Sequence, residues 1–235
     1  MALFAISDLH LAIGMDKPMD IFGIHWENHV QQIAQSWNLA VSDTDTVVIP
    51  GDISWGMTLE QATPDFAFLD RLPGKKIILK GNHDYWWSSV TKIENYFSDQ
   101  GFSSIRLLKN NCFRVEEGTI LCGTRGWILP CENSFKKTDE IIYKRELGRL
   151  TTSLSMAKTL RTPKDRIVVA MHYPPLLPTC LQTDFTAMME EFQVSVCLFG
   201  HLHGSFRDRS FEGEHGGVVY QNISADKLSF KPMRL

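Results

Sequence analysis

Five short apolar segments of this chain each run directly into polar side chains that can bind a metal or transfer a proton. The clearest segment is residues 75–80, which is typical of a buried strand and is followed at once by Gly81, Asn82, His83 and Asp84. Glycine allows backbone conformations and close approaches that other residues resist. A loop that caps a helix would explain one such stretch. Recurrence at four further strands requires a common explanation.

The other four predicted strands are residues 2–7, 46–50, 166–171 and 194–199. Ligands of open α/β sheets bind beyond the carboxyl ends of the strands, so the polar groups should meet at one edge. A buried cluster of such groups is very costly without a compensating cation. The candidate metal ligands are Asp8, His10, Asp52, Asn82, His172, His201 and His203, with His83 beside them.

Mixed sets of carboxylate and imidazole groups suit manganese, iron, zinc and similar ions. Seven candidate ligands are too many for one ion that keeps an open position, but they suit two ions that share a carboxylate. Each residue alone has an ordinary explanation, as a satisfied core histidine or a loop aspartate. Together they predict a centre of two divalent or transition-metal ions (Mn, Fe or Zn).

Helical patterns separate the strands, which is typical of an α/β protein. Residues 104–123 differ, because short apolar runs alternate there with turn sequences, and they predict a β-meander. The length of 235 residues permits one large domain or two small ones, and no linker is visible, so we expect one domain over residues 1–235. The helical patterns lie near residues 24–41, 58–72, 88–100, 138–160 and 183–192.

The charge balance and the cysteines bear on partners and compartment. The net charge of −3 gives no indication of a nucleic-acid surface or a polybasic membrane patch. No apolar run approaches transmembrane length, and we expect no signal peptide. The five cysteines are dispersed and form no CxxC pair, so we expect reduced thiols in a cytoplasmic protein. The cysteines are Cys112, Cys122, Cys131, Cys180 and Cys197.

The order D-x-H, G-D, G-N-H-D, H, G-H-x-H, from Asp8 to His203, resembles the calcineurin-like metallophosphoesterase superfamily, and most closely its small bacterial phosphohydrolase branch. The resemblance implies a four-layer αββα sandwich with the active site at the carboxyl ends of the strands. It also implies two metal ions bridged by Asp52. One ion would be bound by Asp8, His10, Asp52 and His203, and the other by Asp52, Asn82, His172 and His201.

The same resemblance implies a metal-dependent phosphohydrolase that cleaves a phosphomonoester or a phosphodiester by attack of a metal-activated hydroxide. His83 would donate a proton to the leaving group or stabilise phosphate charge. The expected substrate is a small phosphoester, with nucleic acid and membrane partners disfavoured and the oligomeric state open. The alternatives are a non-enzymatic metal-binding scaffold on the same fold and a nuclease.

Two positions depart from the family pattern. Family members commonly carry an acid three residues after the bridging aspartate, which orients the catalytic histidine, and here that position is Trp55. The Ser/Thr protein phosphatases follow that acid with an arginine, and here Gly56 disfavours such a role. Arg125 is the one cation we nominate for substrate binding, against the alternative of an ordinary surface arginine. Trp55, Trp86 and Trp87 would either stack on a substrate ring or pack against the sheet.

Overall fold

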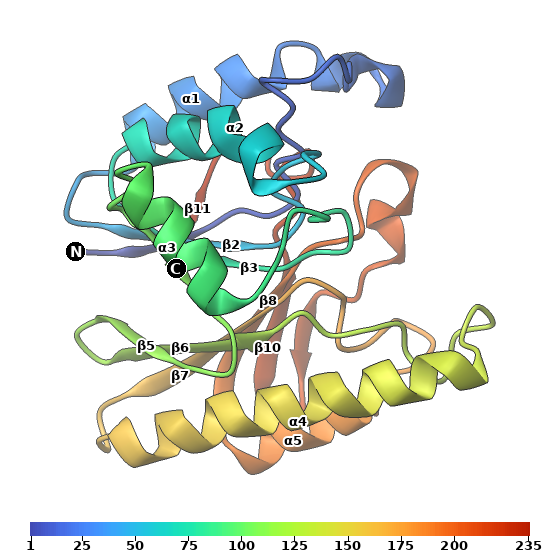
Figure 1. Ribbon diagram of the computed structural model, residues 1–235. Coiled ribbons are helices and arrows are strands. Elements are labelled where there is room, and N and C mark those ends of the chain that lie inside the picture. Colours follow the sequence, from blue (N-terminus) through green and yellow to red (C-terminus); the bar gives the residue numbers. More distant parts are fainter.

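The computed structural model places two β-sheets face to face, with helices on both outer sides (Figure 1). It describes residues 1–235, apart from the side chains of Phe22, Arg207 and Asp208. The predicted α/β fold with four layers in the order αββα is confirmed. The helices α1 (His29–Ala40), α2 (Leu59–Arg71) and α3 (Val90–Asp99) cover the first sheet, and α4 (Lys137–Leu160) and α5 (Asp184–Glu191) cover the second.

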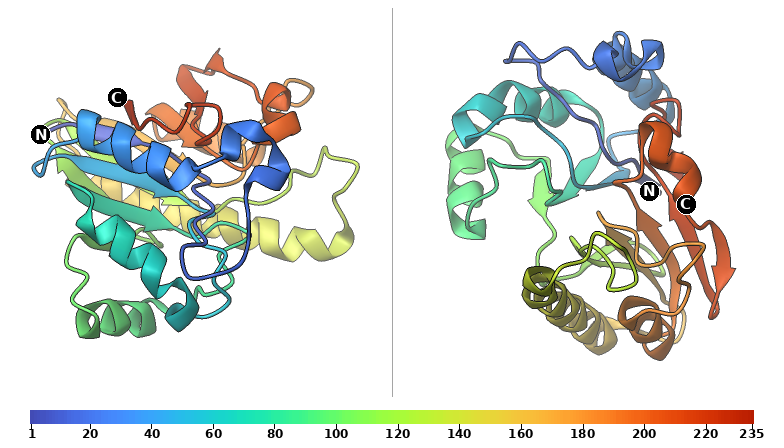
Figure 2. Two further views of the ribbon diagram at one scale, coloured as in Figure 1. Left: turned by 90° about the horizontal axis from the view of Figure 1, so that it is seen from above. Right: turned by 90° about the vertical axis from the view of Figure 1, so that its right-hand side faces the viewer.

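The first sheet has the strand order β11-β1-β2-β3-β4, in which β1 to β4 run parallel and β11 is antiparallel to β1. Because β11 pairs with β1, the two ends of the chain lie near each other (Figure 2). The strands are β1 (Leu3–Ala5), β2 (Thr46–Pro50), β3 (Lys75–Leu79), β4 (Ile105–Leu107) and β11 (Met233–Arg234).

The second sheet has the order β5-β6-β7-β8-β10-β9, with a parallel centre from β6 to β10 and an antiparallel strand at each edge. Its strands are β5 (Phe113–Glu116), β6 (Thr119–Thr124), β7 (Arg166–Met171), β8 (Val194–Phe199), β9 (Gly213–His215) and β10 (Val218–Asn222). Three short 3-10 helices complete the chain, at Asp20–Phe22, Ile24–Trp26 and Gly204–Arg209.

Three apolar cores hold the four layers together. The central core lies between the sheets and contains Leu3, Val48 and Leu79 from the first sheet and Val168 and Leu198 from the second. Buried on both faces, these parallel strands are continuous apolar runs, as the sequence indicated. The two outer cores pack helices against sheets. The carboxyl ends of the parallel strands therefore reach the surface at one rim of the sandwich.

The predicted meander over residues 104–123 is wrong in its first strand. β4 pairs in parallel with β3 in the first sheet, whereas β5 and β6 form a hairpin in the second, around Glu117 and Gly118. The turn chemistry at Asn110 and Asn111 is real, since the Asn111 side chain accepts from the Lys109 N–H and donates to the Leu107 carbonyl. That turn connects two sheets rather than two neighbouring strands, which its sequence cannot distinguish.

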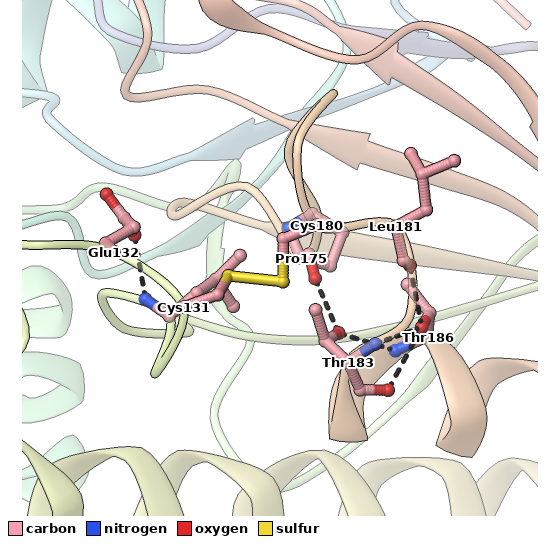
Figure 3. The surroundings of a disulfide bond; sticks show 8 residues. Cys131, Glu132, Pro175, Cys180, Leu181, Thr183 and Thr186 are labelled. Atoms are coloured by element: carbon pink, nitrogen blue, oxygen red, sulfur yellow. Dashed lines mark hydrogen bonds between the residues drawn. A yellow bond between two sulfur atoms is a disulfide. The ribbon is translucent and has the colours of Figure 1, made fainter.

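The expectation of five reduced thiols is also wrong, because Cys131 and Cys180 form a disulfide (Figure 3). The two cysteines are 49 residues apart and approach because their loops follow the neighbouring strands β6 and β7. Cys112, Cys122 and Cys197 are free thiols. The bond joins the loop before α4 to the segment before α5. No helix in the described chain is long and apolar enough to span a membrane.

Candidate metal centre

The polar side chains predicted from the strand ends do converge at one rim. The first sheet supplies those that follow β1, β2 and β3, and the second sheet supplies those that follow β7 and β8. The parallel strands point the same way, so their carboxyl ends bring both sets to the gap between the sheets. The convergent residues are Asp8, His10, Asp52, Asn82, His83, His172, His201 and His203.

Four of these residues have backbone conformations that are rare for residues other than glycine. The φ angles are 57° at Asp8, 46° at His10, 50° at Asp52 and 69° at His201. Such conformations cost about 1–3 kcal/mol each and cluster at functional sites, where surrounding structure holds them in place. Here they turn the side chains that follow β1, β2 and β8 towards a common point.

The first close group consists of Asp8, His10 and His203, whose ligand atoms all lie within 4.8 Å of one another. The Nε2 atoms of His10 and His203 are 3.2 Å apart. The carboxylate of Asp8 also accepts the backbone N–H of His201, at 3.1 and 3.0 Å from its two oxygens. These atoms face one point from both sheets, as ligands of one ion would.

The second close group consists of Asp8, Asp52 and His172, again within 4.8 Å. The Nε2 of His172 lies 2.6 Å from the Asn82 Oδ1 and 3.5 Å from the Asp52 Oδ2. The other ring nitrogen, Nδ1, is 3.0 Å from the Pro50 carbonyl oxygen, which fixes the ring and directs Nε2 inward. Asp8 thus belongs to both groups, whereas Asp52 belongs to the second and lies 3.7 Å from the His10 Nε2 of the first.

Asp52 occupies the middle of this arrangement. Its Oδ1 accepts the backbone N–H of His83 at 2.8 Å. Its Oδ2 is buried without a hydrogen-bond partner, 3.7 Å from the His10 Nε2 and 3.5 Å from the His172 Nε2. A carboxylate oxygen buried without a partner is costly, and a cation on each side would satisfy it.

Burial determines the protonation of the cluster. It raises the pKa of Asp8 to about 6, and burial with the charges of Asp8 and Asp84 raises the pKa of Asp52 well above its usual value. Burial also lowers the pKa values of His10 and His172 well below the ordinary range. Metals ligate ionised carboxylates and neutral imidazoles, so bound cations would favour the forms that bind them. The donor set therefore fits divalent cations.

His201 lies beside the close groups rather than within them. Its ring centroid is 5.1 Å from that of His172 and 4.2 Å from that of Tyr173. Burial, followed by the charges of His203 and His83, lowers its pKa to about 4, so the imidazole is neutral at pH 7. A neutral imidazole at this place is available as a ligand on the side of the cluster that His172 occupies.

His83 lies against Trp55, with 4.4 Å between the ring centroids. Its Nδ1 is buried and has no hydrogen-bond partner among the described atoms. Burial lowers its pKa to about 4. Trp55 also stacks on His10 at 5.0 Å, whereas Trp86 is buried in the outer core and Trp87 packs against that core. Of the three tryptophans, Trp55 is thus the one that contacts the predicted site residues His10 and His83.

Asp84 has a structural role that sequence reasoning missed. Its carboxylate accepts backbone N–H groups from Asp52 at 2.9 Å, Ile53 at 2.9 Å and Gly81 at 2.7 Å, and the indole N–H of Trp86 at 3.0 Å. These bonds tie the loop after β2 to the loop after β3. Gly81 is required there, because a Cβ would collide with the Asp52 carboxylate. The position of Asp84 directly after Asn82 and His83 was the available indication.

A cavity of 620 Å³ opens beside the cluster, and His83, His201 and His203 line it. The two disulfide-linked loops contribute Glu132 and residues 177–179 to its lining, and Phe206 and Arg209 also line it. The predicted substrate residue Arg125 does not line this cavity among the described residues. It lies at the end of β6, where its carbonyl accepts the N–H groups of His172 and Tyr173 at 3.1 and 2.9 Å.

The geometry defines an α/β sandwich with a candidate metal site between its sheets, and comparison with known proteins gives the family. The family model described as calcineurin-like phosphoesterase matches residues 1–205. The chain therefore belongs to the calcineurin-like phosphoesterase family, as its motifs indicated.

Individual relatives are more distant. The Gene 66 protein of Mycobacterium phage L5 is 41% identical over 80 residues, which is 33% of this chain and 37% of that protein. The match thus spans about a third of each chain. Phosphopantetheinyl hydrolase (PptH) from Mycobacterium tuberculosis aligns with a TM-score of 0.58 at 12% identity, covering 100% of this chain and 95% of its own. A protein of unknown function, AQ665 from Aquifex aeolicus, aligns with a TM-score of 0.50 at 14% identity, covering 99% and 95%. These structures share the fold.

Proposed function

We propose that this protein is a metal-dependent phosphohydrolase that cleaves a small phosphomonoester or phosphodiester. The observation that supports it best is the buried Oδ2 of Asp52, unpartnered and 3.5 to 3.7 Å from imidazoles on both sides. The family supports the same reaction class, and PptH, named a phosphopantetheinyl hydrolase, has the same fold.

In this proposal two ions, of Mn, Fe or Zn, share Asp52. Asp8, His10 and His203 would complete one set of ligands, and Asn82, His172 and His201 the other. Bound ions of this kind supply Lewis acidity, lowering the pKa of water and neutralising phosphate charge. Asp84 holds the loops that carry Asp52 and Asn82, so it positions ligands from both strands. No serine or cysteine nucleophile is needed.

His83 is proposed to protonate the leaving group. Its imidazole lines the 620 Å³ cavity and is not paired with any carboxylate there. Burial, followed by the charges of His203 and Lys17, lowers the pKa of His83 to about 4. A phosphate dianion close to the ring would favour the charged imidazolium and raise that pKa towards neutrality. Trp55 holds the ring by contact instead of by a hydrogen bond.

We propose that residues 1–235 act as one domain, since β10 pairs with β8 and β11 pairs with β1, which ties the C-terminal segment to both sheets. A cytoplasmic location stays a prediction. The disulfide argues against it, because such bonds persist mainly in oxidising compartments. Titrating accessible thiols in denatured protein, before and after reduction, tests the bond: three thiols before and five after support it, and five before contradict it.

The experiment that tests the function is a substrate panel. Phosphomonoesters, phosphodiesters, nucleotides and a phosphopeptide are incubated with the protein in Mn²⁺, Fe²⁺ or Zn²⁺ and with EDTA. We expect EDTA-sensitive release of phosphate or alcohol from a small phosphoester, with the phosphopeptide poorer than the best small substrate. Tight metal binding without hydrolysis of any member would contradict the enzyme and favour a scaffold. Preferential cleavage of DNA or RNA would favour a nuclease.

A further inference from the structure

A second cavity, of 240 Å³, lies next to the candidate metal centre, and five of its thirteen lining residues are cations. Its walls come from the ends of β3 and β6, the turn after β4, and one face of α4. The chain carries a net charge of −3, so this accumulation of positive charge is local. The charged lining residues are Lys80, Lys109, Arg125, Arg145, Arg149 and Glu146.

Glu146 neutralises only part of that charge. Its buried carboxylate accepts hydrogen bonds from Thr124 at 2.8 Å and from Arg149 at 2.6 Å, with Arg125 at 3.6 Å and Arg145 at 3.8 Å. One carboxylate balances one of the five cations. Four positive charges are therefore left around the cavity.

The lysines of the cavity have no acidic partner. Neither Lys80 nor Lys109 lies within 4.0 Å of a carboxylate among the described side chains, whereas Lys144, on the same helix as Arg149, pairs with Glu140. Lys109 and Arg149 line the same cavity, and burial, followed by the charge of Arg149, lowers the pKa of Lys109. An anion between them would relieve this repulsion.

Arg125 offers a donor that the protein does not use. Its side chain is 14% exposed, and its Nε is buried without a hydrogen-bond partner among the described atoms. An unsatisfied buried donor is costly, and an oxygen of a bound ligand would remove that cost. A guanidinium also matches the geometry of a phosphate, with two parallel N–H···O bonds.

The cavity adjoins the proposed metal ligands. Lys80 precedes Asn82 by two residues at the end of β3, and the Arg125 carbonyl accepts the backbone N–H of His172. The side chains of Asn82 and His172 are 2.6 Å apart at their polar atoms. The end of β3, which leads to Asn82, and the end of β6, whose Arg125 carbonyl binds the backbone of His172, thus form walls of the basic cavity.

We propose that the basic cavity binds a second phosphate group of the substrate, so that the substrate class is a phosphoester carrying two phosphoryl groups. This inference rests on the proposed function, because the first group is the one hydrolysed at the metal centre. A free phosphate-type anion has the same chemistry, and the experiment below separates the two sources.

The kinetic test uses Lys109→Gln, which breaks no ion pair, with Lys144→Gln as the matched control. A substrate with one phosphate, 4-nitrophenyl phosphate, is compared with a bisphosphorylated one, adenosine 3′,5′-bisphosphate. Lys109→Gln should raise KM for the bisphosphate about tenfold and change kcat/KM for the monophosphate less than about twofold. Lys144→Gln should alter neither. Equal losses on both substrates, or no loss on the bisphosphate, would overturn the assignment to substrate.

A binding measurement keeps the inference independent of turnover. Sulfate, a dianion that the enzyme cannot hydrolyse, is titrated calorimetrically into the full-length protein in Mn²⁺ buffer at fixed ionic strength. Lys109→Glu should weaken sulfate binding about tenfold or more, whether or not the protein hydrolyses a phosphoester. A failure to hydrolyse any phosphoester would contradict the proposed function but not the anion site. Unchanged sulfate affinity rejects the anion site. Weakened sulfate binding with an unchanged KM for the bisphosphate shows a free-anion site and rejects the substrate assignment.

Discussion

The indole of Trp55 lies 4.4 Å from the imidazole of His83, at the place where related enzymes commonly carry an acid. The His83 Nδ1 consequently has no hydrogen-bond partner among the described atoms. Trp55 is itself held by stacking on His10 and by donating its indole N–H to the Met19 sulfur at 3.2 Å. Packing against an aromatic ring thus replaces the usual hydrogen bond to a carboxylate.

The first prediction concerns the leaving group. His83→Ala should lower kcat on an alkyl phosphoester by about a hundredfold, the low end for a general acid, because no carboxylate orients this ring. The loss on a nitrophenyl phosphoester should be less than about tenfold, since nitrophenolate departs without a proton. Steady-state kinetics on both esters, with metal content checked, measures the difference. Equal losses of kcat on the two esters would indicate that His83 stabilises phosphate charge. Loss of bound metal in His83→Ala would contradict its role as a proton donor.

The second prediction concerns Trp55. Trp55→Phe should keep kcat within about threefold, because a smaller ring still contacts His83. Trp55→Ala, compared at full metal content because Trp55 also stacks on His10, should reduce kcat on alkyl esters about tenfold. Nitrophenyl esters should be less affected, since their leaving group needs no proton from His83. Comparing kcat for both substrates in the two variants measures this. If Trp55→Ala were as active as the wild-type protein on alkyl esters, packing would not position His83.

The third prediction concerns Asp84, whose carboxylate accepts several backbone N–H groups. Asp84→Asn replaces one carboxylate oxygen with an NH₂ group, which cannot accept the backbone N–H groups that face it. Each buried N–H left without an acceptor destabilises the folded protein by about 1–3 kcal/mol. The free energy of unfolding should fall by about 2–4 kcal/mol in urea titrations. Asp43→Asn, at an exposed position, is the control and should change stability by less than about 0.5 kcal/mol. A neutral effect of Asp84→Asn would show that the loops do not depend on it.

The fourth prediction concerns the pH dependence of stability. The side chain of Lys76 is fully buried and donates to the Leu72 carbonyl and the Ser104 hydroxyl. Burial lowers its pKa from 10.5 to about 8. The unfolded chain therefore holds more protons between these values, and the free energy of unfolding rises with pH from about 8 to 10.5, by about 1–3 kcal/mol.

Urea unfolding gives the free energy of unfolding of the wild-type protein and of each variant at pH 7.0 and pH 10. The difference between wild type and variant isolates the contribution of Lys76, because the titrations of all other groups cancel. Lys76→Met should lose the rise and be at least as stable as the wild-type protein at pH 7. Lys75→Met, one residue earlier and exposed, should keep the rise. A wild-type pH dependence retained in Lys76→Met would mean that folding does not lower the pKa of Lys76.

The strand-end residues could be placed from the sequence because each directly follows an apolar run that predicts a strand. An apolar run that stops at Asp8, Asp52 or His172 specifies both a strand and its end, and parallel strands in one sandwich end at one rim. The helix near residues 24–41 was less predictable, since a 3-10 turn at Ile24–Trp26 precedes α1. Glu27 and Asn28 separate the two, and apolar periodicity does not reveal such a break.

Other features depend on contacts between distant parts of the chain. Cys131 and Cys180 lie on loops whose conformations are not encoded by their spacing. The cations of the basic cavity come from four segments of the chain, so no linear motif contains them. The sequence singled out Arg125 but did not indicate that the other four cations lie around the same cavity. Most hydrogen-bond partners of Asp84 are buried backbone groups, which a sequence does not display.

The claim at the centre of this account is that Asp52 is shared by two metal ions. Metal content per chain, measured by mass spectrometry after saturation with Mn²⁺ and gel filtration, tests it directly. The wild-type protein should carry two ions, Asp8→Asn about one, and Asp52→Asn neither at full occupancy. One ion per wild-type chain, or two ions retained in Asp52→Asn, would contradict it.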